Sequence, residues 1–145
     1  MKVMPDSNIV LALVITLPYS EAAIRKMQQW EQQKAEFVVP TLWSYEVVST
    51  LRKAVASGRT SPETAAANLQ DILSMEIRQV PPTPALHQQA LDWAARLNQI
   101  VAYDAAYLAL AESEGAEFWT ADQRLANAAL QAGALWVHHI SESLS

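Results

Sequence analysis

Four acidic residues occupy unusual positions in this sequence. Asp6, Glu46, Asp104 and Asp122 lie beside strongly apolar segments, and each follows a predicted strand or falls in the first turns of a predicted helix. Uncompensated burial of carboxylates is costly, because lost hydration and mutual repulsion both favour protonation. Mg²⁺ and Mn²⁺ prefer carboxylate and water oxygens and would remove this conflict. The four acids therefore predict a metal site of the kind that hydrolyses phosphodiesters with an activated water.

Neutral and basic side chains accompany these acids. Ser7 and Asn8 directly follow the first acid, and Thr120 closes the strand before the last. We expect all three to orient carboxylates or water by hydrogen bonding. Lys53 lies seven residues after Glu46, near the same helix face, and is expected with Arg124 to contact substrate. Two further bases, Arg52 and Arg59, are close enough in sequence to reach the same substrate backbone.

Each acid also has a purely structural interpretation. Asp6 and Asp104 are residues of a type that caps helix N-termini. Glu46 can lie on a solvated helix face. The segment TADQ has the capping-box spacing, so Asp122 can be simply a favourable acid in a first helical turn.

Short apolar segments alternate with longer segments of helical periodicity. The predicted strands span residues 2–4, 37–39, 77–80, 117–120 and 135–139. The predicted helices span residues 20–34, 42–56, 62–75, 85–98, 103–113 and 121–132. Gly115 and Gly133 each stand between a helix and a strand, where a left-handed C-cap is expected. This order predicts a parallel sheet covered by helices, with ligands bound beyond the carboxyl ends of the strands.

Composition limits the class of protein. The 145 residues are 51% hydrophobic and 17% charged, which fits one globular domain over 1–145. The lack of cysteine excludes disulfides, thiolate zinc sites and cysteine nucleophiles. The longest apolar run, residues 9–17, is shorter than the roughly 20 residues that span a bilayer, so we expect no membrane association and a cytoplasmic location.

The net charge of −5 argues at first against a nucleic-acid partner. With four of the 15 acids assigned to one site, however, 11 acids remain against 10 bases. The rest of the surface is then nearly neutral. The adjacent pair His138 and His139 lies on a predicted strand, where neighbours point to opposite faces, so the two are poor candidates for a shared ligand set.

The segments PDSN, SYEV, YDAAYLALAE and TADQRL follow one another in an order and spacing that resembles the PIN-domain ribonucleases, and among them the VapC-type toxins of bacterial toxin–antitoxin pairs. The likeness covers nearly the whole chain. It implies a three-layer α/β/α fold with a central parallel sheet of about five strands. It also implies cleavage of RNA by a metal-activated water, without a covalent nucleophile. By this resemblance the residues that bind Mg²⁺ or Mn²⁺ are Asp6, Glu46, Asp104 and Asp122, supported by Ser7, Asn8 and Thr120.

The resemblance further implies a homodimer and a VapB-like antitoxin that blocks the site with a peptide. Trp30 and Trp43 are candidate anchors for such interfaces, the alternative being ordinary core residues. The chain departs from the pattern at Pro5, because proline is disfavoured in a central strand. It departs again at Arg124, where some relatives carry a further acid that bears on a second metal. A catalytically inactive PIN-fold binding module, and less favourably a phospho-acceptor signalling domain, are the alternatives.

Overall fold

The computed structural model describes residues 1–99 and 102–142, so residues 100–101 and 143–145 of the predicted 1–145 domain lie outside the described residues. Its centre is a five-stranded sheet in which all neighbouring strands are parallel, in the order β3-β2-β1-β4-β5. The strands are β1 (Lys2–Pro5), β2 (Glu36–Pro40), β3 (Ile77–Val80), β4 (Glu117–Thr120) and β5 (Val137–His139). The predicted parallel sheet is confirmed.

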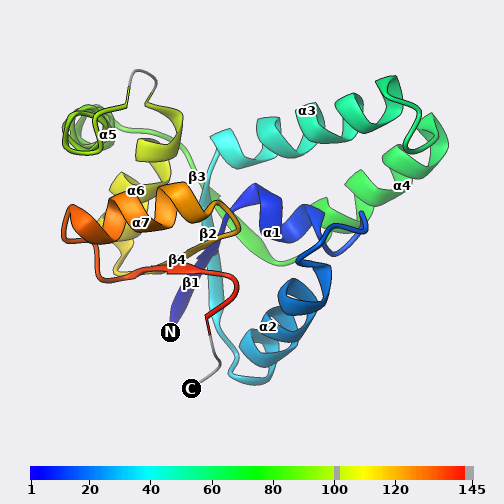
Figure 1. The fold of residues 1–145 in the computed structure, drawn as a ribbon, viewed down its shortest axis with the longest axis horizontal. Coiled ribbons are helices and arrows are strands. Elements are labelled where there is room, and N and C mark those ends of the chain that lie inside the picture. The colour runs from blue at the N-terminus through cyan, green and yellow to red at the C-terminus, as the bar shows by residue number, and fades with distance from the viewer. Residues whose placement is uncertain (100–101, 143–145) are drawn as a thin grey trace.

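Helices cover both faces of this sheet (Figure 1). They are α1 (Ser7–Leu11), α2 (Ser20–Gln32), α3 (Leu42–Ala56), α4 (Pro62–Leu73), α5 (Pro84–Arg96), α6 (Tyr103–Glu114) and α7 (Gln123–Gln131). Alternate strand residues point to opposite faces. Val3 and Trp119 accordingly pack in a core with α2, whereas Met4 and Phe118 pack in the larger core with α3, α5, α6 and α7. The fold is the predicted three-layer α/β/α arrangement.

Many predicted boundaries shift by one or two residues, and three differences have a clear physical reason. Helix α1 was not expected, because a five-residue helix with Ile9, Val10 and Leu11 all buried has no amphipathic pattern. Strand β5 begins two residues later than predicted, and Leu135 before it is 77% exposed. Helix α7 also begins two residues later, because Asp122 is its N-cap.

Pro5 is accommodated as the last residue of β1. The register joins β1 to β2 only at Lys2 and Val3, whereas Pro5 pairs with Trp119 of β4. The next backbone amide, that of Asp6, continues the pairing with β4 by donating to the Trp119 carbonyl at 2.9 Å. The proline therefore lies where β1 no longer pairs with β2, and its missing N–H breaks no bond of the sheet register.

The two tryptophans considered as interface anchors belong to the core. Trp30 is 3% exposed and packs edge-on against Trp119 at a ring-centroid distance of 5.6 Å. Trp43 is 1% exposed in the larger core. Their prediction as partner anchors is therefore wrong, and burial of apolar surface explains both.

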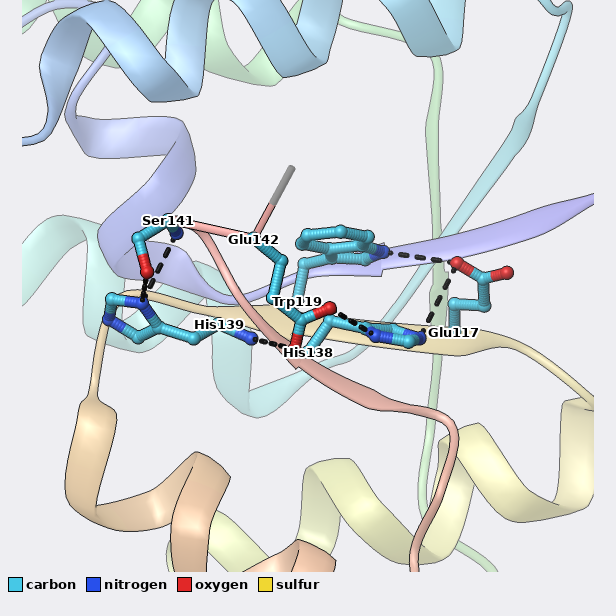
Figure 2. Close-up of polar contacts among 6 residues, drawn as sticks. All are labelled: Glu117, Trp119, His138, His139, Ser141 and Glu142. Carbon is cyan, nitrogen blue, oxygen red and sulfur yellow. Dashed lines mark hydrogen bonds and ion pairs between the residues drawn. The ribbon is translucent and has the colours of Figure 1, made fainter. Parts of the chain in front are cut away.

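The segment after β5 is held against the sheet by a histidine between two carboxylates (Figure 2). The His138 ring stacks on Trp119 with centroids 4.6 Å apart. Its Nδ1 lies 2.9 Å from Glu142, and its Nε2 lies 3.8 Å from Glu117. His139 instead directs Nε2 toward the carbonyl of Ala121. The two histidines thus face different partners, as the strand periodicity predicts.

Across residues 1–99 and 102–142, no helix has the length and apolar character needed to cross a membrane.

Candidate active site

Strand β1 lies at the centre of the sheet, where the order of strands reverses. The chain proceeds outward from β1 to β2 and β3 on one side, and β4 and β5 occupy the other side. In open parallel sheets such a reversal leaves a crevice at the carboxyl ends of the strands, where ligands bind. Asp6 directly follows β1 and Thr120 is the last residue of β4, so both stand at this crevice.

Asp6 is held at this position by three neutral side chains. Its Oδ2 accepts hydrogen bonds from Thr120 Oγ1 at 2.7 Å and Asn8 Nδ2 at 3.3 Å, and its Oδ1 accepts one from Ser7 Oγ at 3.4 Å. Asp6 occupies the N-cap position of α1, yet its side chain makes no capping hydrogen bond. Helix capping therefore does not account for this acid, and the expected support by Ser7, Asn8 and Thr120 is present.

Asn8 and Thr120 also join the ends of the two strands. Asn8 Nδ2 donates to Thr120 Oγ1 at 3.4 Å, and Asn8 Oδ1 accepts from the Ala121 amide at 3.2 Å. Thr120 is fully buried and accepts a further bond from the Asp122 amide at 3.0 Å. This network fixes β1 and β4 relative to each other directly beneath the carboxylate.

Glu46, from α3, reaches the same place. It is half-buried, and its Oε1 accepts a hydrogen bond from Tyr107 Oη at 2.5 Å. The same oxygen lies 3.5 Å from Ser7 Oγ, whose single proton can be donated either to Glu46 or to Asp6. The solvated-face interpretation of Glu46 is therefore wrong. Sequence reasoning missed Tyr107, although it lies three residues after Asp104 and so on the same face of α6.

Asp104 and Asp122 occupy the starts of α6 and α7. Asp104 lies in the first turn of α6, whose N-cap is Ala102, and its Oδ2 accepts from Gln99 Nε2 at 3.3 Å. Its interpretation as an N-cap is wrong. Asp122 is exposed, and its Oδ1 caps α7 by accepting from the amides of Arg124 and Leu125 at 3.0 and 3.1 Å.

We call Asp6, Glu46, Asp104 and Asp122 the acidic site. The pKa of each of the first three is influenced by the charge of another member. Burial, reinforced by the charges of Glu46 and Asp104, raises the pKa of Asp6 to about 7. Burial, and then the charge of Asp104, raises the pKa of Glu46. Burial, and then the charge of Asp122, raises the pKa of Asp104. These contributions connect each acid with its neighbour, and the joint role of the four acids as one metal site stays a prediction.

The donors of the acidic site suit a hydrated hard cation. None of the ion pairs within residues 1–99 and 102–142 involves one of the four acids. Over these same residues, no three His, Asp or Glu side chains are grouped closely enough to hold one ion by themselves. Mg²⁺ usually binds one or two carboxylates directly and keeps several waters, which can bridge to further acids. An oxygen-only set with one buried member and three more open members fits such an ion.

The bases expected to contact substrate separate into two groups. Lys53 is exposed on α3 and lines a groove that also contains Ser7 and Asn8. Arg59, in the turn after α3, lines the same groove. Arg124 is exposed on α7 and is not among the residues that line it.

Solved structures with the same fold include proteins of toxin–antitoxin systems. The chain is similar to PAE2754 from Pyrobaculum aerophilum (TM-score 0.71, 21% identity, 97% of this chain and 84% of that chain). It is similar to VapBC2 from Rickettsia felis, solved bound to a DNA fragment from its promoter (TM-score 0.70, 12% identity, 96% and 98%). It is also similar to VapC20 from Mycobacterium tuberculosis, a sarcin-ricin loop cleaving toxin (TM-score 0.64, 19% identity, 88% and 95%). At these identities the likeness concerns the fold.

No curated protein matches the sequence. The family model of the PIN domain matches residues 3–130, a span that runs from β1 to the end of α7 and contains the whole acidic site. The chain belongs to the PIN domain family.

Proposed function

We propose that this protein is a Mg²⁺- or Mn²⁺-dependent endoribonuclease and the VapC-type toxin of a toxin–antitoxin pair. The observation that carries the nuclease assignment is the buried carboxylate of Asp6, which lies at the reversal of strand order and is coupled to Glu46 and Asp104 without a compensating base. A bound divalent ion would supply charge neutralisation and Lewis acidity for hydrolysis of a phosphodiester.

The chain's own residues have distinct roles in this proposal. Asp6, Glu46, Asp104 and Asp122 hold the ion, directly or through its waters. Thr120, Asn8 and Ser7 fix the rotamer of Asp6, and Tyr107 fixes Glu46 by donating its hydroxyl proton. Such supporting hydrogen bonds keep ligands preorganised.

The biological assignment is supported by the similar proteins. VapBC2 from Rickettsia felis is a toxin–antitoxin complex by name, and VapC20 from Mycobacterium tuberculosis is described as a toxin that cleaves the sarcin-ricin loop. We propose by analogy an RNA substrate, a VapB-like antitoxin and a homodimer for this chain. A PIN-fold binding module without activity is the alternative, and the presence of all four acids disfavours it.

A cleavage assay tests the nuclease assignment. Purified protein should cut single-stranded RNA when Mg²⁺ or Mn²⁺ is added and should stop when a chelator removes the ion. Asp104→Asn should lower the cleavage rate about 100-fold. The reason is that this carboxylate would no longer hold the ion, either directly or through one of the ion's waters. Asp92→Asn, on the exposed face of α5, is the matched control and should cut like the parent. Undiminished cleavage in chelator contradicts the mechanism, and no cleavage with bound metal favours the binding module.

Growth and size measurements test the toxin assignment separately. Expression of this chain alone should slow bacterial growth, and co-expression of the neighbouring antitoxin frame should restore it. Light scattering should report a dimer at tens of micromolar. Normal growth in an expressing strain whose purified protein cleaves RNA would remove the toxin assignment and leave the nuclease.

A further inference from the structure

A groove with a volume of about 440 Å³ begins at the acidic site and runs between α1 and the second half of α3. Its size falls within the range of about 300–1,000 Å³ that is usual for ligand sites. Figure 1 shows these two helices, with α3 drawn above α1. Apart from Ser7 and Asn8, the residues that line it neither belong to the acidic site nor support it by hydrogen bonding.

The groove connects directly to the carboxylates. Ser7 lines it and places its hydroxyl 3.4 Å from Asp6 and 3.5 Å from Glu46. Asn8 lines it next to Ser7, and the Tyr19 hydroxyl donates to the Asn8 carbonyl at 3.2 Å. One end of the groove is therefore separated from the acidic site by a single hydrogen-bonding side chain, that of Ser7.

The two walls differ in chemistry. One wall comes from α1 and the segment after it, and beyond Ser7 and Asn8 its members are apolar or aromatic: Leu11, Ile15, Leu17 and Tyr19. The opposite wall comes from α3 and the turn after it and carries Lys53 and Arg59, both exposed. Within the described residues, neither base is in an ion pair.

An apolar wall facing a cationic wall matches an unpaired nucleotide chain. Single-stranded nucleic acid is bound by cations along its phosphates and by aromatic or apolar surface against its bases. A duplex presents neither face of its bases, and duplex RNA is recognised by its shape. Lys53 lies two helical turns, or about 10 Å, beyond Glu46 along α3, which suits a phosphate next to the cleaved one rather than the cleaved one itself.

Resting on the proposed function, we propose that this groove binds single-stranded RNA on one side of the cleaved bond. Lys53 and Arg59 hold backbone phosphates, and the wall containing Tyr19 receives an unpaired base. Arg124, on α7, lies outside this path.

Binding measured without cleavage tests the groove. In an Asp104→Asn background with Mg²⁺, fluorescence anisotropy reports the affinity for a labelled single-stranded RNA and for a blunt duplex of the same sequence. Lys53→Gln and Arg59→Gln should each weaken single-strand binding several-fold. Each should also lower the slope of log affinity against log salt by about 0.7. Arg25→Gln, on the exposed face of α2 and outside the groove, removes the same charge elsewhere and should bind within twofold of the parent.

The aromatic wall has its own test. Tyr19→Leu should weaken single-strand binding about 10-fold, whereas Tyr19→Phe keeps the ring and should bind like the parent. Equal affinity for duplex and single strand overturns the proposal, as does an equal loss of affinity in Arg25→Gln and Lys53→Gln. The proposal is also overturned if an acidic peptide binds through Lys53 and Arg59 while the affinity for RNA does not depend on these two residues.

Failure of the nuclease assignment gives a different result. A parent protein that does not cleave but binds RNA through Lys53 and Arg59 supports the groove and contradicts the enzyme. A parent that cleaves, with both bases dispensable for binding, supports the enzyme and contradicts the groove.

Discussion

Replacing Asp6 with asparagine should stabilise the metal-free protein by about 2–4 kcal/mol at pH 8 while abolishing cleavage. Burial raises the pKa of this carboxyl from its ordinary value of 3.8 to about 7, and one pKa unit corresponds to about 1.4 kcal/mol. Asparagine removes the buried charge and fits the same contacts. Its carbonyl can accept from Thr120 and its amide can donate to Ser7, whose hydroxyl then donates to Glu46.

The size of this stabilisation depends on pH. Between pH 4 and 7 the folded state binds more protons at Asp6 than the unfolded state does, so the stability of the parent falls as the pH rises through this window. The advantage of Asp6→Asn should therefore be near zero at pH 4 and full above pH 7. Urea unfolding of parent and variant in chelator at both pH values measures it.

Metal should narrow the difference in stability between the parent and Asp6→Asn. At a free Mg²⁺ concentration of 100 times the dissociation constant, the parent should gain about 2.7 kcal/mol, and Asp6→Asn should gain much less. Asp92→Asn is the control and should follow the parent under every condition. An Asp6→Asn protein that is destabilised equally at pH 4 and pH 8, with or without metal, would show that the carboxylate is structural only.

Replacing Trp43 with alanine should cost about 3–5 kcal/mol, a large part of the total stability of a domain. The side chain is 1% exposed in the larger core, so its loss leaves a cavity. Trp43→Phe should cost distinctly less. The indole Nε1 is buried without a partner among the described residues, and phenylalanine removes that unsatisfied donor.

Tyr45 provides the matched control for this prediction. It lies on the same helix, is 74% exposed, and Tyr45→Ala should change the unfolding free energy by about 0.5 kcal/mol or less. Urea unfolding of the isolated protein decides the matter. Unchanged stability in Trp43→Ala would contradict the contribution of this side chain to the core.

The fold was predictable from sequence because its signals are local. Strands of three to five residues alternate with helices, and glycine marks two helix ends with positive φ, 64° at Gly115 and 95° at Gly133. Helix α1 could not be recognised, because burial all round leaves no periodicity. Tryptophan is favoured both in cores and at interfaces, so residue type alone could not place Trp30 and Trp43.

The site was predictable in part. An acid beside apolar residues indicates a carboxylate whose burial must be compensated. This signal drew attention to Asp6, Glu46 and Asp104. It could not separate the cap of α7 from a ligand, since Asp122 is exposed and bonds two amides of its own helix. Tyr107 was missed because a tyrosine within an apolar helix is typical of a core residue. Only the folded structure shows its hydroxyl directed at Glu46.

The pairing of β1 with β4 also sets when during synthesis this site can exist. Asp6 and its hydrogen-bond donor Thr120 are 114 residues apart, and β4 is the strand that pairs with β1 on that side. At about 5–20 residues per second, the ribosome needs on the order of 10 s to travel between them. Until then β1 can pair only with β2, the Asp6 carboxylate lacks its shortest hydrogen bond, and α6 with Asp104 is incomplete or newly made. The acidic site therefore cannot be complete for most of translation, and on the proposed function a nascent chain would be inert during that time.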